Sequence, residues 1–173
     1  MKTIVIGIQW GDEGKGKIVD VLAENHDVIV RYNGGANAGH TVYRGEKKYI
    51  FHMVPSGILY PDKICVIGNG CVVDLDLLRK EMTSLEADGI DFAGRFYISD
   101  RAKVIMPYHK EKESGEKRLD TTKKGIGPAY TSRASRTALT VGDIFYTVED
   151  TSLEKEVLSR LCDDMELHGM NGE

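Results

Sequence analysis

Cysteine is scarce in this sequence of 173 residues, and its spacing argues against two kinds of structure. The three cysteines, Cys65, Cys71 and Cys162, are an odd number and form no C-x-x-C pair. Neither a disulfide framework nor a tetrahedral zinc site is therefore expected. We expect all three thiols to be reduced, with Cys65 in the core of a strand.

An excess of positive charge and a long apolar run are missing as well. The net charge of −4 and the sequence pI near 5.8 argue against binding to nucleic acid or to an anionic membrane, which needs clustered Lys and Arg. No apolar run approaches the roughly 20 residues that span a bilayer, and the chain opens on an apparent strand instead of a signal peptide. We therefore expect a cytoplasmic protein with small-molecule substrates.

The pattern of apolar residues predicts an α/β fold, with a mainly parallel central sheet flanked by helices. Short apolar runs typical of buried strands cover residues 3–8, 28–32, 63–67 and 95–99. Helical spacing covers residues 16–24, 74–88 and 153–167, with Asp74 as N-cap and Gly89 as a stop in the second helix. Residues 41–43 and 48–52 read as a small β-hairpin, and the charged segment 109–117 as a solvated helix or loop.

The first glycine-rich segment, residues 11–17 (GDEGKGK), follows the first predicted strand. Its spacing satisfies the phosphate-loop pattern G-x-x-x-x-G-K, but Ile18 stands where that pattern supplies a metal-binding hydroxyl. Asp12 is the nearest alternative metal ligand. Glycine amides, a helix N-terminus and two lysines predict phosphate binding, although a simple turn with solvated lysines would share this composition.

The second glycine-rich segment, residues 33–41 (NGGANAGHT), follows the second predicted strand. Ligands of open parallel sheets lie beyond the carboxyl ends of the strands, so the first two loops can face one ligand. Asn37 offers a hydrogen-bonding amide and His40 a proton donor. A purely structural His40 is the alternative.

The third segment, residues 121–130 (TTKKGIGPAY), is followed by Arg133 and Arg136. Pro128 lacks an N–H donor and biases its neighbour away from helix, so residues 125–128 are predicted to form a tight irregular turn. Hydroxyls beside several cations suit a phosphomonoester. Charges on a surface loop would give the same pattern.

These segments together resemble the adenylosuccinate synthetases, a family with a P-loop-NTPase-like nucleotide-binding core. The resemblance rests on residues 9–17, 33–41, 121–122, 125–130 and 141–143, which occur in the family's order and spacing. It implies a ligase that joins IMP to L-aspartate at the expense of GTP, with Mg²⁺ as cofactor, in the biosynthesis of AMP.

The resemblance also implies site residues. Asp12 would be the general base, His40 the general acid and Lys15 a further catalytic residue, while Asp12 and the Gly39 carbonyl would bind one Mg²⁺. The GTP phosphates would contact Gly11, Asp12, Glu13, Gly14, Lys15, Gly16, Lys17, Gly39, His40 and Thr41. IMP would contact Asp12, Glu13, Gly14, Lys15, Asn37, Ala38, Gly39, His40 and Thr122, and Arg136 would reach the IMP of the neighbouring subunit in a homodimer.

Chains of this family are much longer than 173 residues. We therefore interpret residues 1–173 as the N-terminal part of a single synthetase domain, without the guanine-recognising and aspartate-binding segments, and expect this part alone not to turn over. Two alternatives stay open. One is another phosphoryl-transfer enzyme or switch of the P-loop class, against which Ile18 argues, and the other is a noncatalytic nucleotide-binding or dimerisation fragment.

Overall fold

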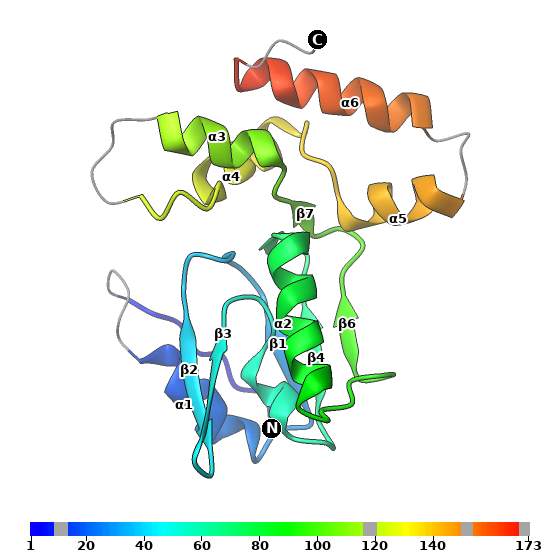
Figure 1. Ribbon diagram of the computed structural model, residues 1–173. Helices are drawn as coiled ribbons and strands as arrows, with labels where there is room; N and C mark the ends of the chain where they lie inside the picture. The colour runs from blue at the N-terminus through cyan, green and yellow to red at the C-terminus, as the bar shows by residue number, and fades with distance from the viewer. Residues whose placement is uncertain (9–13, 116–120, 150–153, 170–173) are drawn as a thin grey trace.

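A three-stranded parallel sheet forms the centre of the protein (Figure 1). The computed structural model describes residues 1–8, 14–115, 121–149 and 154–169. The strands are β1 (Val28–Arg31), β4 (Ile64–Ile67) and β6 (Phe96–Ile98), in the order β1-β4-β6. Each had been predicted from its apolar run, so the expected mainly parallel sheet is confirmed.

Helix α2 (Leu75–Ala87) crosses from β4 to β6 and covers one face of this sheet (Figure 1). Its N-cap is Asp74, whose carboxylate accepts the Leu77 N–H at 3.2 Å, and Gly89 follows its end with a φ of 74°. Leu78 and Leu85 are buried in the same core as Met53 and Ile58. The predicted helix, its cap and its stop are confirmed.

A small antiparallel hairpin lies beside the sheet (Figure 1). It consists of β2 (His40–Arg44) and β3 (Lys47–Phe51), with His40 opposite Phe51. Helix α1 (Lys15–Ala23) packs against β2 and against the short helix η1 (Ser56–Leu59). The predicted hairpin and first helix are thus present within a residue or two of the expected bounds.

Four further helices gather beyond one end of the sheet (Figure 1). They are α3 (Pro107–Gly115), α4 (Ile126–Ser135), α5 (Val141–Glu149) and α6 (Glu154–Leu167), and β5 (Val72–Val73) pairs in parallel with β7 (Lys103–Val104) beneath them. Two bonds of 2.7–2.8 Å from the Arg160 guanidinium to the Asp143 carboxylate tie α6 to α5.

The strand predicted over residues 3–8 is wrong. These residues have no regular secondary structure, and the side chains of Ile4, Ile6 and Ile8 are 80%, 64% and 91% exposed. Residues 3–8 reach the residues flanking β1 through a 2.9 Å bond between the Thr3 hydroxyl and the His26 ring and a 3.5 Å bond from the Tyr32 hydroxyl to the Val5 carbonyl. An apolar run forms a strand only where a neighbouring strand pairs with it and a core covers it, and the described residues supply neither.

Two further predictions, one about the third segment and one about residues 109–117, are corrected as well. Residues 125–128 do not form an irregular turn, because Gly125 is the N-cap of α4 and Pro128 lies in its first turn. The N–H groups of that turn have no helical partner, so proline is tolerated there. Helix α3 is not merely a solvated face, since its His109 is fully buried and its Glu113 is 9% exposed.

All three cysteines are free thiols. Cys65 is fully buried in β4, as predicted, and burial raises its pKa to about 12. None of the helices in the described ranges has the length and apolar character needed to cross a membrane.

Candidate functional site

The second glycine-rich loop is the point at which the other two motifs converge. It joins β1 to β2 and ends at His40. A Cβ atom placed on Gly16 of α1 would lie 2.9 Å from both Cβ and Cγ of His40. The backbone of the first helical turn therefore rests directly on His40, and a glycine permits this approach.

Helix α1 presents its N-terminus at this contact. Gly14 adopts the left-handed conformation with a φ of 81°, and its carbonyl accepts the Lys17 N–H at 3.0 Å. The first N–H groups of a helix have no helical acceptor and attract anions. Gly11, Asp12 and Glu13 lie outside the described residues, so their roles stay predictions.

The third motif packs against the beginning of the same loop. The Tyr130 hydroxyl accepts the Gly34 N–H at 2.8 Å and donates to the Gly70 carbonyl at 2.9 Å. A Cβ on Gly35 would lie 2.5 Å from Cδ1 of Ile126. The N-terminal half of α4 is thereby held against the second loop.

The cations Arg31 and Lys15 lie near His40, together with the carboxylate of Glu81. Burial lowers the pKa of its imidazole, and the nearby cations Arg31 and Lys15 lower it further. The ring is therefore neutral at pH 7 and can donate through one N–H. A ligand with several negative charges would find complementary charge at this position.

Two charged residues that position these loops were missed in the sequence. Arg31 of β1 donates to the carbonyls of Gly35, His52 and Met53, and so links the second loop to the end of the hairpin. Glu81 of α2 accepts the backbone N–H groups of His52 and Met53 at 2.6 and 3.1 Å, that of Val54 at 2.9 Å, and Nδ1 of His52 at 3.2 Å. The available signals were an arginine inside an apolar strand and a carboxylate three residues after Leu78 on the apolar face of α2.

The remaining predicted site residues are placed less closely together. Asn37 and Gly39 are exposed, and Ala38, His40 and Thr41 are partly exposed. Thr122 and Arg136 are both exposed and flank α4, one before its start and the other at its end. Among the described residues, no hydrogen bond or ion pair joins Thr122 or Arg136 to the Gly16 and His40 contact.

Glycine loops gathered around a helix N-terminus, at one edge of a parallel sheet, define an α/β protein with a P-loop-like nucleotide-binding fold. The family model for adenylosuccinate synthetase matches residues 4–167. The chain belongs to the adenylosuccinate synthetase family.

Relatives and solved structures agree with this assignment. The chain is 53% identical over 147 residues to the adenylosuccinate synthetase of Moorella thermoacetica and 55% identical over 151 residues to that of Carboxydothermus hydrogenoformans. These matches cover 82% and 83% of the chain but 34% and 35% of the relatives. The chain therefore spans about a third of the length of the curated relatives it matches.

Two solved structures resemble the fold. The fully ligated adenylosuccinate synthetase from Plasmodium falciparum has a TM-score of 0.76 and 39% identity, covering 96% of this chain and 40% of that one. A cyanophage S-2L succinoaminodeoxyadenylate synthetase, bound to dGMP and dATP as an energy donor, has a TM-score of 0.66 and 25% identity, covering 85% and 41%.

Proposed function

We propose that this chain carries the phosphate-binding loops and the acid and base of an adenylosuccinate synthetase, which joins IMP to L-aspartate with hydrolysis of GTP. The observation that carries the proposal is the contact between Gly16 and His40. It sets a helix N-terminus beside a histidine and near two cations, and such groups can stabilise the charge of a phosphoryl group during its transfer.

In this proposal the GTP phosphates lie against residues 11–17 and 39–41. IMP lies against residues 12–15, residues 37–40 and Thr122. The packing of α4 on Gly34 and Gly35 supports a shared site, because it brings the segment that follows Thr122 to the second loop.

The chemistry needs a base and a hydrogen-bond donor at the purine ring. Asp12 takes the N1 proton of IMP, and the negative charge that develops on O6 attacks the γ-phosphorus of GTP, with GDP leaving. His40 donates its N–H to this charge, and Lys15 neutralises phosphate charge. The aspartate amine then displaces phosphate from C6 and loses a proton, which gives adenylosuccinate.

The donors for a magnesium ion are hard oxygen atoms. Mg²⁺ prefers carboxylate and carbonyl oxygens, and Gly39 fits because it is an exposed glycine immediately before His40. The Asp12 carboxylate and the Gly39 carbonyl would hold the ion. When bound, it neutralises charge on the phosphate oxygens.

Arg136 is assigned to the IMP site of a second subunit in a homodimer. Its exposure, at the end of α4 remote from Gly125, supports a role outside its own subunit's loops. Mixing an Asp12→Asn chain with an Arg136→Leu chain, each extended to the length of the relatives, tests this. If sites are shared in a twofold dimer, the mixture should regain about a quarter of the parent activity at limiting IMP, where Arg136→Leu by itself is slow because its KM is raised. No recovery would contradict the assignment.

We propose that residues 1–173 are the N-terminal part of one synthetase domain and do not turn over by themselves. A noncatalytic nucleotide-binding or dimerisation fragment is the second candidate, favoured by the coverage of only about a third of the relatives. Incubation of the chain with GTP, IMP, aspartate and Mg²⁺, with adenylosuccinate followed by absorbance, tests the absence of turnover that both candidates share. Turnover would contradict both, and GTP binding without turnover would favour a binding fragment.

The site itself is tested by Gly16→Ala. The new methyl group would push against the His40 ring, so GTP binding measured by calorimetry should weaken about tenfold, which is about 1.4 kcal/mol. Gly115→Ala, where an added methyl meets nothing within 4 Å, is the matched control and should bind as the parent does. Equal affinity of the two variants would remove the Gly16 and His40 contact from the site.

A further inference from the structure

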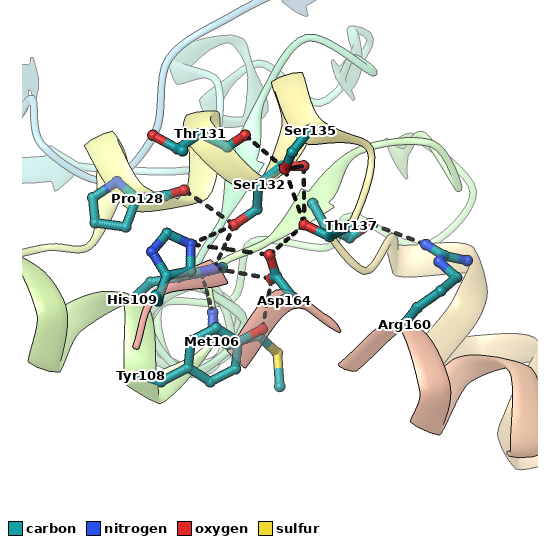
Figure 2. A network of polar contacts seen from close by, with 12 residues as sticks. Met106, Tyr108, His109, Pro128, Thr131, Ser132, Ser135, Thr137, Arg160 and Asp164 are labelled. Atoms are coloured by element: carbon teal, nitrogen blue, oxygen red, sulfur yellow. Dashed lines mark hydrogen bonds and ion pairs between the residues drawn. The ribbon is translucent and has the colours of Figure 1, made fainter. Parts of the chain in front are cut away.

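A buried polar cluster joins three helices that the proposed reaction does not use directly. His109 of α3, Ser132 of α4 and Asp164 of α6 are each fully buried, and His168, just after α6, is 5% exposed. Figure 2 shows the side chains of the first three residues converging with Thr137, the second residue after α4.

The hydrogen bonds of the cluster argue against two chemical roles. Nδ1 of His109 accepts the Met106 N–H at 3.0 Å, so the ring proton lies on Nε2, which faces Asp164 at 3.2 Å and Ser132 at 3.0 Å. A protonated nitrogen offers no lone pair to a metal ion. A nucleophilic triad would instead place the serine and the carboxylate on opposite ring nitrogens, with the serine accessible.

Asp164 is the hub of the cluster. Its carboxylate accepts the Tyr108 hydroxyl at 2.6 Å, the Thr137 hydroxyl at 2.6 Å and Nε2 of His109 (Figure 2). Burial alone would raise the pKa of Asp164, but hydrogen bonds from side chains including His109 and Thr137 outweigh it and hold the pKa below its ordinary value. Asp164 is therefore an ionised acceptor buried beside the end of α4.

The end of α4 is a strained turn. Arg136 is the C-cap and has a φ of 67°, a left-handed conformation that is unfavourable for a residue with a side chain. The only other non-glycine residue with positive φ in the described ranges is Lys123, next to Thr122. Both strained residues thus flank α4 and coincide with or adjoin a predicted IMP contact.

We infer that Asp164 is a positioning residue for Arg136. By binding the Thr137 hydroxyl, Asp164 holds the turn after α4 in its left-handed form, and this form sets the direction in which the exposed Arg136 leaves the helix. The alternative is that backbone bonds suffice, since the N–H groups of Thr137 and Ala138 both donate to the Ser132 carbonyl, at 3.1 and 3.2 Å. The role of Arg136 in IMP binding rests on the proposed function, whereas the control of its conformation does not.

A double-mutant cycle on the 173-residue chain tests the conformational claim. Arg136→Gly relieves the strain of a positive φ and should raise the midpoint of thermal unfolding. Thr137→Val removes the hydroxyl at nearly constant shape. In that background the increase in midpoint caused by Arg136→Gly should be about half of the parent's or less, because the turn relaxes. Thr137→Ser keeps the hydroxyl and should restore the full rise.

Thr131→Val is the control, because Thr131 is an exposed threonine of α4 whose hydroxyl donates to the Gly127 carbonyl. The rise caused by Arg136→Gly should be unchanged in that background. An equal rise in the parent, Thr137→Val and Thr131→Val backgrounds would show that the backbone alone holds the turn, and would overturn the inference.

The consequence for the site is tested in a chain extended to the length of the relatives. Thr137→Val should raise the KM for IMP about fivefold to tenfold, the size of one lost hydrogen bond, without lowering kcat, and Thr137→Ser should reverse the effect. If Arg136→Leu raises this KM and Thr137→Val does not, the positioning role is overturned while the proposed function stands. If neither raises it, the IMP role of Arg136 fails, and the cycle still decides the conformational claim.

Discussion

At the residue scale, Glu81 shows how one buried carboxylate organises a segment that reaches the site. It accepts three consecutive backbone N–H groups, those of His52, Met53 and Val54, and the ring of His52. Nε2 of that ring would lie 3.5 Å from a Cβ on Gly39. Glu81 lies in α2, and it therefore supports the loop that carries His40 through its contacts with His52.

Replacement of Glu81 tests this support. Glu81→Leu would leave the three amides without their acceptor and should lower the free energy of unfolding by about 3 kcal/mol in urea titrations. Glu81→Gln keeps one carbonyl oxygen and should cost about 1–2 kcal/mol. Glu86→Leu, at an exposed position of the same helix, should stay within about 0.5 kcal/mol of the parent, and a similar loss there would contradict a specific role for Glu81.

At the scale of elements, α4 illustrates how packing corrects a local rule. A proline in the middle of a helix is costly, but Pro128 lies in the first turn, where no helical hydrogen bond is lost. The partners that favour the helix are distant in sequence: Gly34 and Gly70 bind Tyr130, and Gly35 contacts Ile126. Local propensity alone could not reveal them.

Substitutions at two glycines distinguish the packing of α4 against the second loop from the intrinsic stability of the helix. Gly35→Ala would force a methyl group against Ile126 and the Val72 side chain, so the free energy of unfolding should fall by about 1–3 kcal/mol. Gly127→Ala, within α4 and with nothing within 4 Å of the added methyl, should raise it by about 0.5–1 kcal/mol. Chemical denaturation measures both, and changes of the same sign would contradict the docking described for the second loop.

At the scale of the whole molecule, the central sheet is covered on one face. Ile29 and Cys65 face the core under α2 and η1, whereas Val28 and Val30 of β1 are 47% and 51% exposed. These parallel strands carry apolar residues on both faces, a pattern typical of a sheet that is buried on both faces.

A pair of isoleucines measures this difference in burial. Ile29→Ala removes a core side chain that is 7% exposed and should cost about 2–5 kcal/mol of unfolding free energy. Ile6→Ala, at 64% exposure, should change it by about 0.5 kcal/mol or less. Equal losses of unfolding free energy in the two variants would instead support the buried strand that the apolar run over residues 3–8 predicts.

Low pH should destabilise the packing of α3, α4 and α6, because it protonates Asp164. Its pKa is lower in the folded chain than in the unfolded one, where a carboxyl group titrates near 4, so its contribution to stability is complete above about pH 5 and is lost as the pH falls. The unfolding free energy should therefore decline below about pH 5 in the parent, with a shallower decline in Asp164→Asn. Some slope should remain, because the pKa of Asp143 is also lowered: burial opposes this, but bonds from Arg160 and Thr140 prevail. Identical slopes would remove Asp164 from the acid response.

Much of the fold and the family could be predicted because the signals are local. The period of apolar residues, the Asp74 cap and the spacing of the glycine loops each lie within one short stretch, and backbone sterics and local hydrogen bonds act over that range. The sequence alone therefore determined the parallel sheet, the hairpin, the second helix and the resemblance to adenylosuccinate synthetases. The roles of Asp12 and Glu13 stay predictions, since these residues lie outside the described part of the chain.

The tertiary structure decided which polar residues are buried and with whom. Arg31 donates a hydrogen bond to the carbonyl of His52, 21 positions away in the sequence, and His109 is hydrogen-bonded to Asp164, 55 positions away. A buried charge is stable only with partners that satisfy it, and partners from separate elements are set by packing and not by neighbouring residues. Packing partners distant in sequence also decide whether a strand forms and which elements lie side by side. Only the tertiary structure could therefore show that the strand over residues 3–8 is absent and that α6 lies beside the turn which carries Arg136.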